Sequence, residues 1–475
     1  MISVLPWRLR FTMRTVLTEI NPAVRVSDLG YAKVFRNGGS RCVLPISVNY
    51  LRGVPFVTKS TCLLAVYSVA FLCGPWLNAA ELRYENLELV IDDEVIIAPA
   101  SAEVSAANMV VDAEGSIWVN STTTSPGLFK STDGGKTWST TAIHVPDAPG
   151  EQYVAGFAIT WDRRLWIIHQ EPPKGGGHVF SDDVFVSTST DQGLSWQTTK
   201  IDFPNFAPNA PKDPYTSMSI AWCHPNVIER PDGTVMFSAS MRYEDWGEYQ
   251  QTDQTRPGVR DVMIRTRDGG KTWGDPTIVH QHATETAYAV DPNDPNHIFA
   301  ATRVQRRSLL GEDPAEVLEK TGVPYPPKPK SWVYKNGLLL KSKDGGRTFR
   351  EVPNSLLGFG SYRFSMVWTK SNMIVLVSLG GQEPGEAKFD NDHVVRLSLD
   401  GGHTWADGTP DGTTGLNQAR KFSVVPSYRD VGKADHYSAA VASTVSLPGD
   451  RFLTLCRYKR DKILKGRIWH LENVR

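Results

Sequence analysis

Short runs in which apolar and polar residues alternate recur from residue 104 to near the C-terminus, and each run has the length of a β-strand. Alternation with a period of two places one face of a strand against a core and the other toward solvent, so these runs predict strands rather than helices. The runs form six pairs, most of them joined by a short turn: residues 104–111 with 116–120, 157–161 with 165–169, 226–229 with 234–241, 286–290 with 297–302, 364–368 with 373–378, and 438–446 with 451–456.

A third strand-like run follows most pairs and ends in a turn motif with the pattern Ser/Thr, any residue, Asp, any residue, Gly, any residue, Ser/Thr, aromatic. The motif occurs five times, at residues 131–138, 189–196, 266–273, 342–349 and 398–405. The Asp and the hydroxyls can bond to local backbone, and Gly accepts the positive φ of a tight bend, so the motif predicts the tip of a β-hairpin rather than a catalyst.

The spacing of the motif predicts the architecture. Successive motif aspartates lie 58, 77, 76 and 56 residues apart, which is about one four-stranded sheet with its loops. A supersecondary unit repeated at this period is typical of a β-propeller. We therefore expect an all-β fold, a six-bladed β-propeller of four-stranded antiparallel blades. The sixth unit lacks a motif and an outer strand, and residues 82–91 are expected to supply that strand and close the ring.

Composition narrows the classes of partner. Lys plus Arg and Asp plus Glu number 51 each among 475 residues, so we expect no nucleic-acid partner. The His residues are scattered and no Cys pair has the spacing of a metal site, so we expect no cofactor and no metal, although a calcium ion in a loop stays open. A monomer is expected.

Residues 59–80 differ from the rest of the chain. A basic flank, about a dozen apolar residues and small residues before Glu81 are typical of an export signal, and the run is too short for a stable membrane span. We expect residues 1–80 to be an N-terminal extension and residues 81–475 to be the propeller domain of a secreted or periplasmic protein. The signal lies far from residue 1, which indicates a start codon placed too far upstream or an unstructured extension. An interior strand and an uncleaved anchor remain alternatives.

Meander geometry indicates which residues meet at the centre of the ring. The motif hairpin joins strands three and four, so the start of strand one and the end of strand two lie at the opposite mouth. The residues at those positions are Asn120, Tyr153, His169, His224, Arg242, Glu285, Arg303, Tyr362, Arg363, Tyr437 and Arg457. Four are arginines, which bind oxyanions in bidentate fashion, so the rim predicts a carboxylate, sulfate or phosphate ligand. The alternative is that each Arg pairs with an acid of a neighbouring blade.

Five motifs in register resemble the Asp-box (BNR) repeat of the sialidase, or neuraminidase, superfamily. The resemblance implies an exo-acting glycoside hydrolase whose members clamp the sialic acid carboxylate with three arginines and use a Tyr, activated by a Glu, as nucleophile. Residues 436–449, in which a Tyr-Ser pair precedes a strand and a turn, resemble the nucleophile segment. The resemblance thus implies Tyr437 as nucleophile and Glu285 as its activator. A neutral nucleophile suits an anomeric centre that already bears a carboxylate.

The resemblance also implies the clamp. Arg303 shares a strand pair with Glu285, as one clamp Arg does in the family, and Arg363 or Arg457 would complete the set. Arg242 and His224 compete with Arg303 and Glu285 as the match to the family's Arg–Glu pair, but they have a His at the position of the acid.

The first blade departs from the family pattern. The Arg-Ile-Pro signature is absent, since residues 105–109 stand in its place, and residues 121–127 hold no acid. The acid/base residue of the family lies in that loop. Asp183, or its neighbour Asp182, is the substitute one blade later.

Three functions are therefore open. The first is a sialidase-like hydrolase with an acidic glycan as substrate, such as one bearing sialic acid. The second is a non-catalytic propeller that binds acidic glycans or a protein partner. The third is a polysaccharide lyase, in which His224 or Tyr437 removes the proton α to a uronate carboxylate that Arg242 neutralises.

Overall fold

The chain divides into two compact units, Met1–Asn78 and Ala79–Arg475. The structure, a computed structural model, describes residues 30–35, 41–46, 82–99, 107–121, 127–142, 153–170, 184–201, 215–220, 225–243, 258–306, 313, 315–316, 334–359, 362–379, 393–405, 416, 420, 422–425, 437–438, 443–458 and 463–473. In the first unit these residues form an antiparallel hairpin of β1 (Gly30–Phe35) and β2 (Arg41–Ile46). The expected export segment at residues 59–80 lies outside the described residues.

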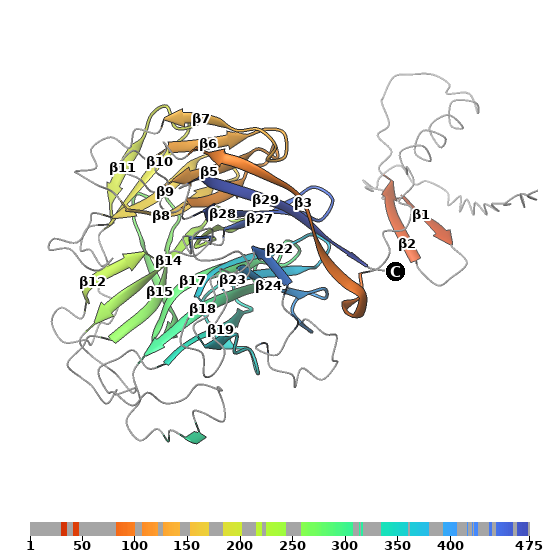
Figure 1. The fold of residues 1–475 in the computed structure, drawn as a ribbon. Helices are drawn as coiled ribbons and strands as arrows, with labels where there is room; N and C mark the ends of the chain where they lie inside the picture. The colour runs from red at the N-terminus through yellow and green to blue at the C-terminus, as the bar shows by residue number, and fades with distance from the viewer. Residues whose placement is uncertain are drawn as a thin grey trace, which may run out of the picture. The chain divides into compact units, whose positions relative to one another are not determined.

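The second unit is built from six antiparallel sheets, each with four strand positions (Figure 1). Each sheet is a blade, numbered here in chain order. Blades 1 and 2 comprise β4 (Ala107–Val111), β5 (Ile117–Ser121), β6 (Gly127–Ser131) and β7 (Ser139–Ala142), then β8 (Tyr153–Ile159), β9 (Leu165–Gln170), β10 (Val184–Ser189) and β11 (Gln197–Lys200).

Blades 3 and 4 have interrupted inner and outer strands, respectively. Blade 3 comprises β12 (Tyr215–Ile220), β13 (Val227–Glu229), β14 (Val235–Tyr243), β15 (Gly258–Thr266) and β16 (Gly274–Gln281). Blade 4 comprises β17 (Ala283–Val290), β18 (Ile298–Arg306), β19 (Tyr334–Ser342), β20 (Arg350–Glu351) and β21 (Gly358–Phe359). Both β12 and β13 pair with β14, and both β20 and β21 pair with β19, so each sheet keeps four positions.

Blades 5 and 6 complete the ring. They comprise β22 (Tyr362–Trp368), β23 (Ile374–Leu379), β24 (His393–Ser398) and β25 (Phe422–Val425), then β26 (Tyr437–Ser438), β27 (Thr444–Leu447), β28 (Arg451–Tyr458), β29 (Leu464–Asn473) and β3 (Leu87–Ala98). Innermost strands of most neighbouring blades contact one another, β17 contacts β14 between blades 4 and 3, and β27 contacts β4, which closes the circle. The six-bladed all-β fold expected from the sequence is confirmed.

The outer strand of blade 6 comes from the other end of the propeller unit. Strand β3 pairs with β29 along its whole length, from Leu87 opposite Asn473 to Ala98 opposite Leu464. The side chain of Glu94 bonds to Lys465 and Arg467 across this seam, at 2.8 and 3.0 Å. Ring closure by the N-terminal strand is confirmed, but the strand runs further along the chain than residues 82–91, because its extent follows the length of β29.

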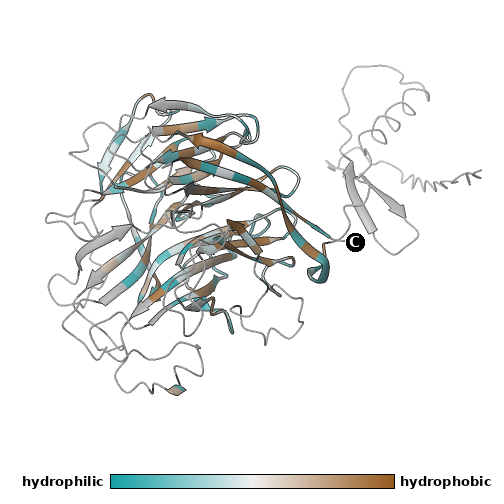
Figure 2. Ribbon diagram, viewed as in Figure 1, coloured by the Kyte–Doolittle hydropathy of each residue, from teal (hydrophilic) through white to brown (hydrophobic). Residues whose placement is uncertain are grey.

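Within the described part of the propeller, the hydrophobic core forms six clusters, one between each pair of neighbouring blades. Trp166 of blade 2 packs with Phe237 and Trp273 of blade 3, for example, and Phe299 of blade 4 packs with Phe364 of blade 5. Hydrophobic residues are distributed along the blade strands (Figure 2), and neighbours on one strand can join different clusters: Phe237 belongs to the cluster between blades 2 and 3, and Met236 to that between blades 3 and 4. Burial of apolar surface between blades is therefore what holds the ring together.

The five Asp-box motifs have a structural role. In the first, Asp133 accepts bonds from the backbone N–H groups of Lys136 and Thr137 and from the Thr137 hydroxyl, at 3.0, 3.0 and 2.6 Å. Ser131 Oγ accepts the N–H of Gly135 and donates to Asp133. Bonds from the Thr137 side chain and backbone and from Ser131 lower the pKa of Asp133 to about 2. These carboxylates are fully engaged in shaping the hairpin.

The Gly at the fifth position of each motif packs the hairpin against the preceding blade. A Cβ on Gly270 would lie 2.8 Å from Trp166, and one on Gly402 would lie 2.5 Å from Phe299. Both glycines have positive φ, at 91° and 86°. An arginine of the preceding blade can also donate to a carbonyl of the Asp-box. Arg230 of blade 3 donates to Gly345 O of blade 4 at 3.0 Å. Among the described residues, no helix is both long and apolar enough to cross a bilayer.

Candidate functional site

An ion pair marks the mouth opposite the Asp-box hairpins. Glu285 lies near the start of β17, the innermost strand of blade 4, and Arg303 lies toward the end of β18. Arg303 Nη1 donates to Glu285 Oε1 at 2.8 Å, and both side chains are about four-fifths buried, with exposed fractions of 17% and 20%. The arginine thus pairs with an acid of its own blade.

The second carboxylate oxygen of Glu285 is buried and has no hydrogen-bond partner among the described residues. A buried carboxylate oxygen normally receives at least one hydrogen bond, because its desolvation is otherwise uncompensated. This oxygen of Glu285 can therefore accept a hydrogen bond. The donor can belong to a ligand, to water or to a side chain outside the described part.

The backbone at this mouth is distorted at two corresponding positions. Glu285 is the extra residue of a β-bulge, between the pairs Thr284–Arg303 and Thr286–Thr302, and has φ of 56°. Arg363 has φ of 54° and lies in the matching register shift at the start of β22, in blade 5. Bulges re-aim side chains, and a left-handed conformation in a non-glycine residue costs about 1 kcal/mol or more, so such positions concentrate at functional sites.

The remaining arginines of the expected rim occupy the strand ends that meander geometry assigns to them. Arg242 stands in β14 opposite Ser217, and Arg457 stands in β28 opposite Ser438. The side chains of both lie outside the described part of the chain, so only their backbone positions are known.

Tyr437 begins β26, the first segment of the innermost strand of blade 6, and its backbone pairs with Tyr458. The strand starts of Glu285, Arg363 and Tyr437 thus belong to three consecutive blades and open on the same mouth. The Tyr437 side chain is outside the described part. Asp183 and His224 lie outside the described residues altogether, and their roles stay predictions.

Two other rim residues are engaged within their own blades. The ring of His169 is almost completely buried and bonds through Nε2 to Ser187 Oγ at 2.8 Å. Burial lowers the pKa of His169 to about 4, so this ring is neutral at physiological pH. Asn120 is buried and accepts the Asn108 N–H at 2.9 Å. Both residues support the strands rather than reach into solvent.

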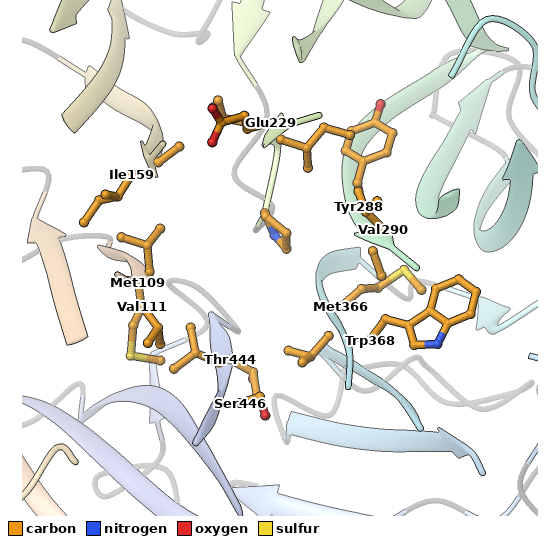
Figure 3. A pocket seen from close by; sticks show the side chains of 18 of the residues that line it. Met109, Val111, Ile159, Glu229, Tyr288, Val290, Met366, Trp368, Thr444 and Ser446 are labelled. Atoms are coloured by element: carbon orange, nitrogen blue, oxygen red, sulfur yellow. The ribbon is translucent and has the colours of Figure 1, made fainter. Parts of the chain in front are cut away.

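A cavity of about 380 Å³ lies at the other mouth, on the Asp-box side (Figure 3). All six blades line it with the final residues of their innermost strands, including Val111, Ile159, Val290 and Trp368. Glu229, at the end of β13, is the carboxylate on its rim. Sequence reasoning missed this cavity, although a charged residue at a strand position that other blades fill with Val or Trp was a usable signal.

Among the described residues, no group of three or more His, Cys, Asp or Glu is placed to hold a metal ion.

Comparisons with known proteins agree with this architecture. The family model described as the BNR/Asp-box repeat matches residues 129–140. A protein of unknown function from Dyadobacter fermentans has a similar fold, with a TM-score of 0.51, 15% identity, and coverage of 82% of this chain and 100% of that one.

Two further solved structures are the Hadza microbial sialidase Hz136 (TM-score 0.49, 14% identity, covering 80% of this chain and 68% of that one) and a Penicillium chrysogenum alpha-L-arabinanase complexed with arabinobiose (TM-score 0.48, 10% identity, covering 80% and 98%). No curated protein matches the sequence. The matched repeat, the five motifs and the closed ring of six sheets identify the chain as a six-bladed β-propeller with BNR/Asp-box repeats.

Proposed function

We propose that the protein is a secreted, sialidase-like glycoside hydrolase that acts on the end of a glycan bearing an acidic sugar, at the mouth opposite the Asp-box hairpins. The observation that supports this most is the Glu285–Arg303 pair, with one buried carboxylate oxygen of Glu285 left without a partner among the described residues. An acid of this kind beside an arginine supplies a proton acceptor and an anion-binding group within one blade.

In this proposal the arginines bind the carboxylate of the sugar. Arg303 and Arg363 come from adjacent blades, and Arg457 and Arg242 are the candidates for the remaining contact. Because a guanidinium offers two parallel donors to a carboxylate, arginines from different blades orient the sugar ring as well as neutralise its charge.

Tyr437 is the proposed nucleophile. Its phenol would attack the anomeric carbon while Glu285 accepts the phenolic proton, and the glycosyl–tyrosine bond would then be hydrolysed. A phenol is a weak nucleophile at neutral pH, so it needs such a base. Asp183, which lies one blade after the position that the family resemblance implies, is the proposed acid for the leaving oxygen.

Turnover of fluorogenic sialosides, and of sulfated and uronic acid glycans, tests the proposal on the purified propeller. We expect Tyr437→Phe and Glu285→Gln each to lower kcat by about a hundredfold or more, the scale of a lost nucleophile or general base. Glu88→Gln, an exposed carboxylate on the outer strand β3, is the matched control and should leave kcat unchanged.

The alternatives give distinct results. Absence of turnover on every glycan would end the hydrolase proposal, and glycan binding that persists equally in Tyr437→Phe would favour a non-catalytic propeller. A product that absorbs in the near ultraviolet would instead indicate a lyase. Export is part of the proposal, and the N-terminal sequence of protein recovered outside the cytoplasm would test whether cleavage follows residues 59–80.

A further inference from the structure

We propose that the cavity on the Asp-box side is a second binding site, and that it takes a small molecule with an apolar body and one cationic ammonium group. It lies at the opposite end of the ring from the Glu285–Arg303 pair. The inference is therefore independent of the proposed hydrolase activity.

The walls of the cavity define the apolar part of the ligand. Met109, Val111, Ile159, Val290, Met366 and Trp368 surround the space in Figure 3. The volume of about 380 Å³ falls within the range of about 300–1,000 Å³ that is usual for small-molecule sites. Walls of this kind favour an alkyl or aryl group over a sugar, whose hydroxyls would lose their hydrogen bonds to water there.

Hydrogen bonds between blades hold the walls in place. The Met109 N–H donates to Ser443 Oγ at 3.0 Å, and the Thr444 N–H donates to Ser365 Oγ at 2.9 Å. On the other side of the cavity, the Tyr288 N–H donates to the carbonyl of Pro225 at 2.8 Å. The innermost strands of blades 1, 6 and 5 are thus tied to one another, as are those of blades 3 and 4. A cavity held in this way is formed before a ligand arrives and costs little ordering on binding.

The rim carries the charge that selects the ligand. Glu229 is half-buried, and its Oε2 accepts the backbone N–H of Trp161 at 2.7 Å. Trp161, whose backbone N–H makes this bond, is 76% exposed. A carboxylate at the edge of an apolar space forms a site for an ammonium group through a charge-assisted hydrogen bond.

The turns around the same mouth strengthen this preference. Together with Glu229, the turns from first to second strands carry eight acidic residues and four basic ones: Asp112, Glu114, Asp162, Glu229, Asp232, Asp291, Asp294 and Asp450 against Arg163, Arg164, Arg230 and Lys370. Arg163 and Arg164 pair with two of these acids, Glu114 and Asp162, and Arg230 donates to Gly345 O, so the excess of four acidic residues remains. The net negative field favours a cation and disfavours an anion at the mouth.

Isothermal titration calorimetry with octylammonium, octanol and octanoate separates the apolar and the ionic contributions, since the three share one chain. At neutral pH the full-length protein should bind octylammonium about tenfold or more tightly than octanol, and octanoate more weakly still. Glu229→Gln should remove the preference of ammonium over alcohol, while Glu88→Gln on the outer strand β3 should preserve it.

A second variant tests whether the cavity itself is the site. Ser446 lines the cavity and is partly exposed, so Ser446→Trp should fill the space and abolish binding of all three probes. Circular dichroism would establish that this variant is folded. Equal affinity for the three probes, no binding at millimolar concentration, or binding that survives Ser446→Trp in a folded protein would each overturn the proposal.

Discussion

Replacement of Gly402 by Ala tests whether the Asp-box hairpins act as wedges between blades. A Cβ at this position would lie 2.5 Å from Cζ and 2.6 Å from Cε2 of Phe299, in the preceding blade. Phe299 is fully buried, and its ring centroid lies 5.6 Å from that of Trp368 and 6.3 Å from that of Trp405. The ring has little room to move away, so the methyl group must be accommodated by strain.

Two costs combine at Gly402. The positive φ of 86° costs an alanine about 1–2 kcal/mol, and overpacking of a filled core costs about 1–3 kcal/mol. We expect Gly402→Ala to lower the free energy of unfolding by about 2–5 kcal/mol in urea titrations followed by tryptophan fluorescence. The matched control is Gly134→Ala in the first box, where φ is 75° but no atom lies within 4 Å of the new Cβ. The free energy of unfolding of that variant should fall only by the backbone cost, about 1–2 kcal/mol.

A double-mutant cycle isolates the contact. If Phe299 is what the new methyl group strikes, the penalty of Gly402→Ala should shrink by about 1 kcal/mol or more in a Phe299→Leu background. Equal destabilisation by Gly402→Ala and Gly134→Ala would refute the close packing of this hairpin against Phe299. An unchanged penalty of Gly402→Ala in the Phe299→Leu background would refute it as well.

Two further predictions concern pH. Burial raises the pKa of Asp261, between blades 3 and 4, to about 6, so the protonated form favours folding and this stabilisation is lost as the pH rises from about 4 through 6. Asp261→Asn should therefore remove a decline of up to about 3 kcal/mol in the free energy of unfolding between about pH 3 and 7, and an unchanged decline would contradict this. Conversely, bonds from the Thr272 side chain and backbone lower the pKa of Asp268 to about 2, so its stabilisation is present above about pH 4 and is lost as the pH falls through 2. Asp268→Asn should lower the free energy of unfolding by roughly 1 kcal/mol at pH 7, after allowance for solvent screening, and by less at pH 2. An equal loss at both pH values would show that the ionised carboxylate is not what stabilises the hairpin.

The positions of the candidate site were open to prediction from the sequence, but their geometry was not. Meander topology places Glu285, Arg363 and Tyr437 at the starts of innermost strands, and this follows from strand order alone. The bulges that give Glu285 and Arg363 positive φ, and the bond from Arg303 to Glu285, depend on how each strand registers with its neighbour. Both faces of β17 are buried between blades, so a one-residue shift of register does not change which of its positions must be apolar.

The cavity on the Asp-box side shows the same limit. Val111, Val290 and Trp368 resemble ordinary core residues in the sequence, because inward and outward faces of an innermost strand are equally apolar. Only the closed ring shows that these residues border one space, with Glu229 at its edge.

By itself, the sequence determined the local chemistry and the number of blades. Five Asp-box motifs and six strand pairs follow from residue types at short spacing, where hydrogen bonds and glycine backbone freedom act over a few residues. The tertiary structure alone decided where β3 ends, which blade each hairpin wedges against, and what meets at the two mouths. Those features arise from packing between segments hundreds of residues apart, which short-range patterns do not encode.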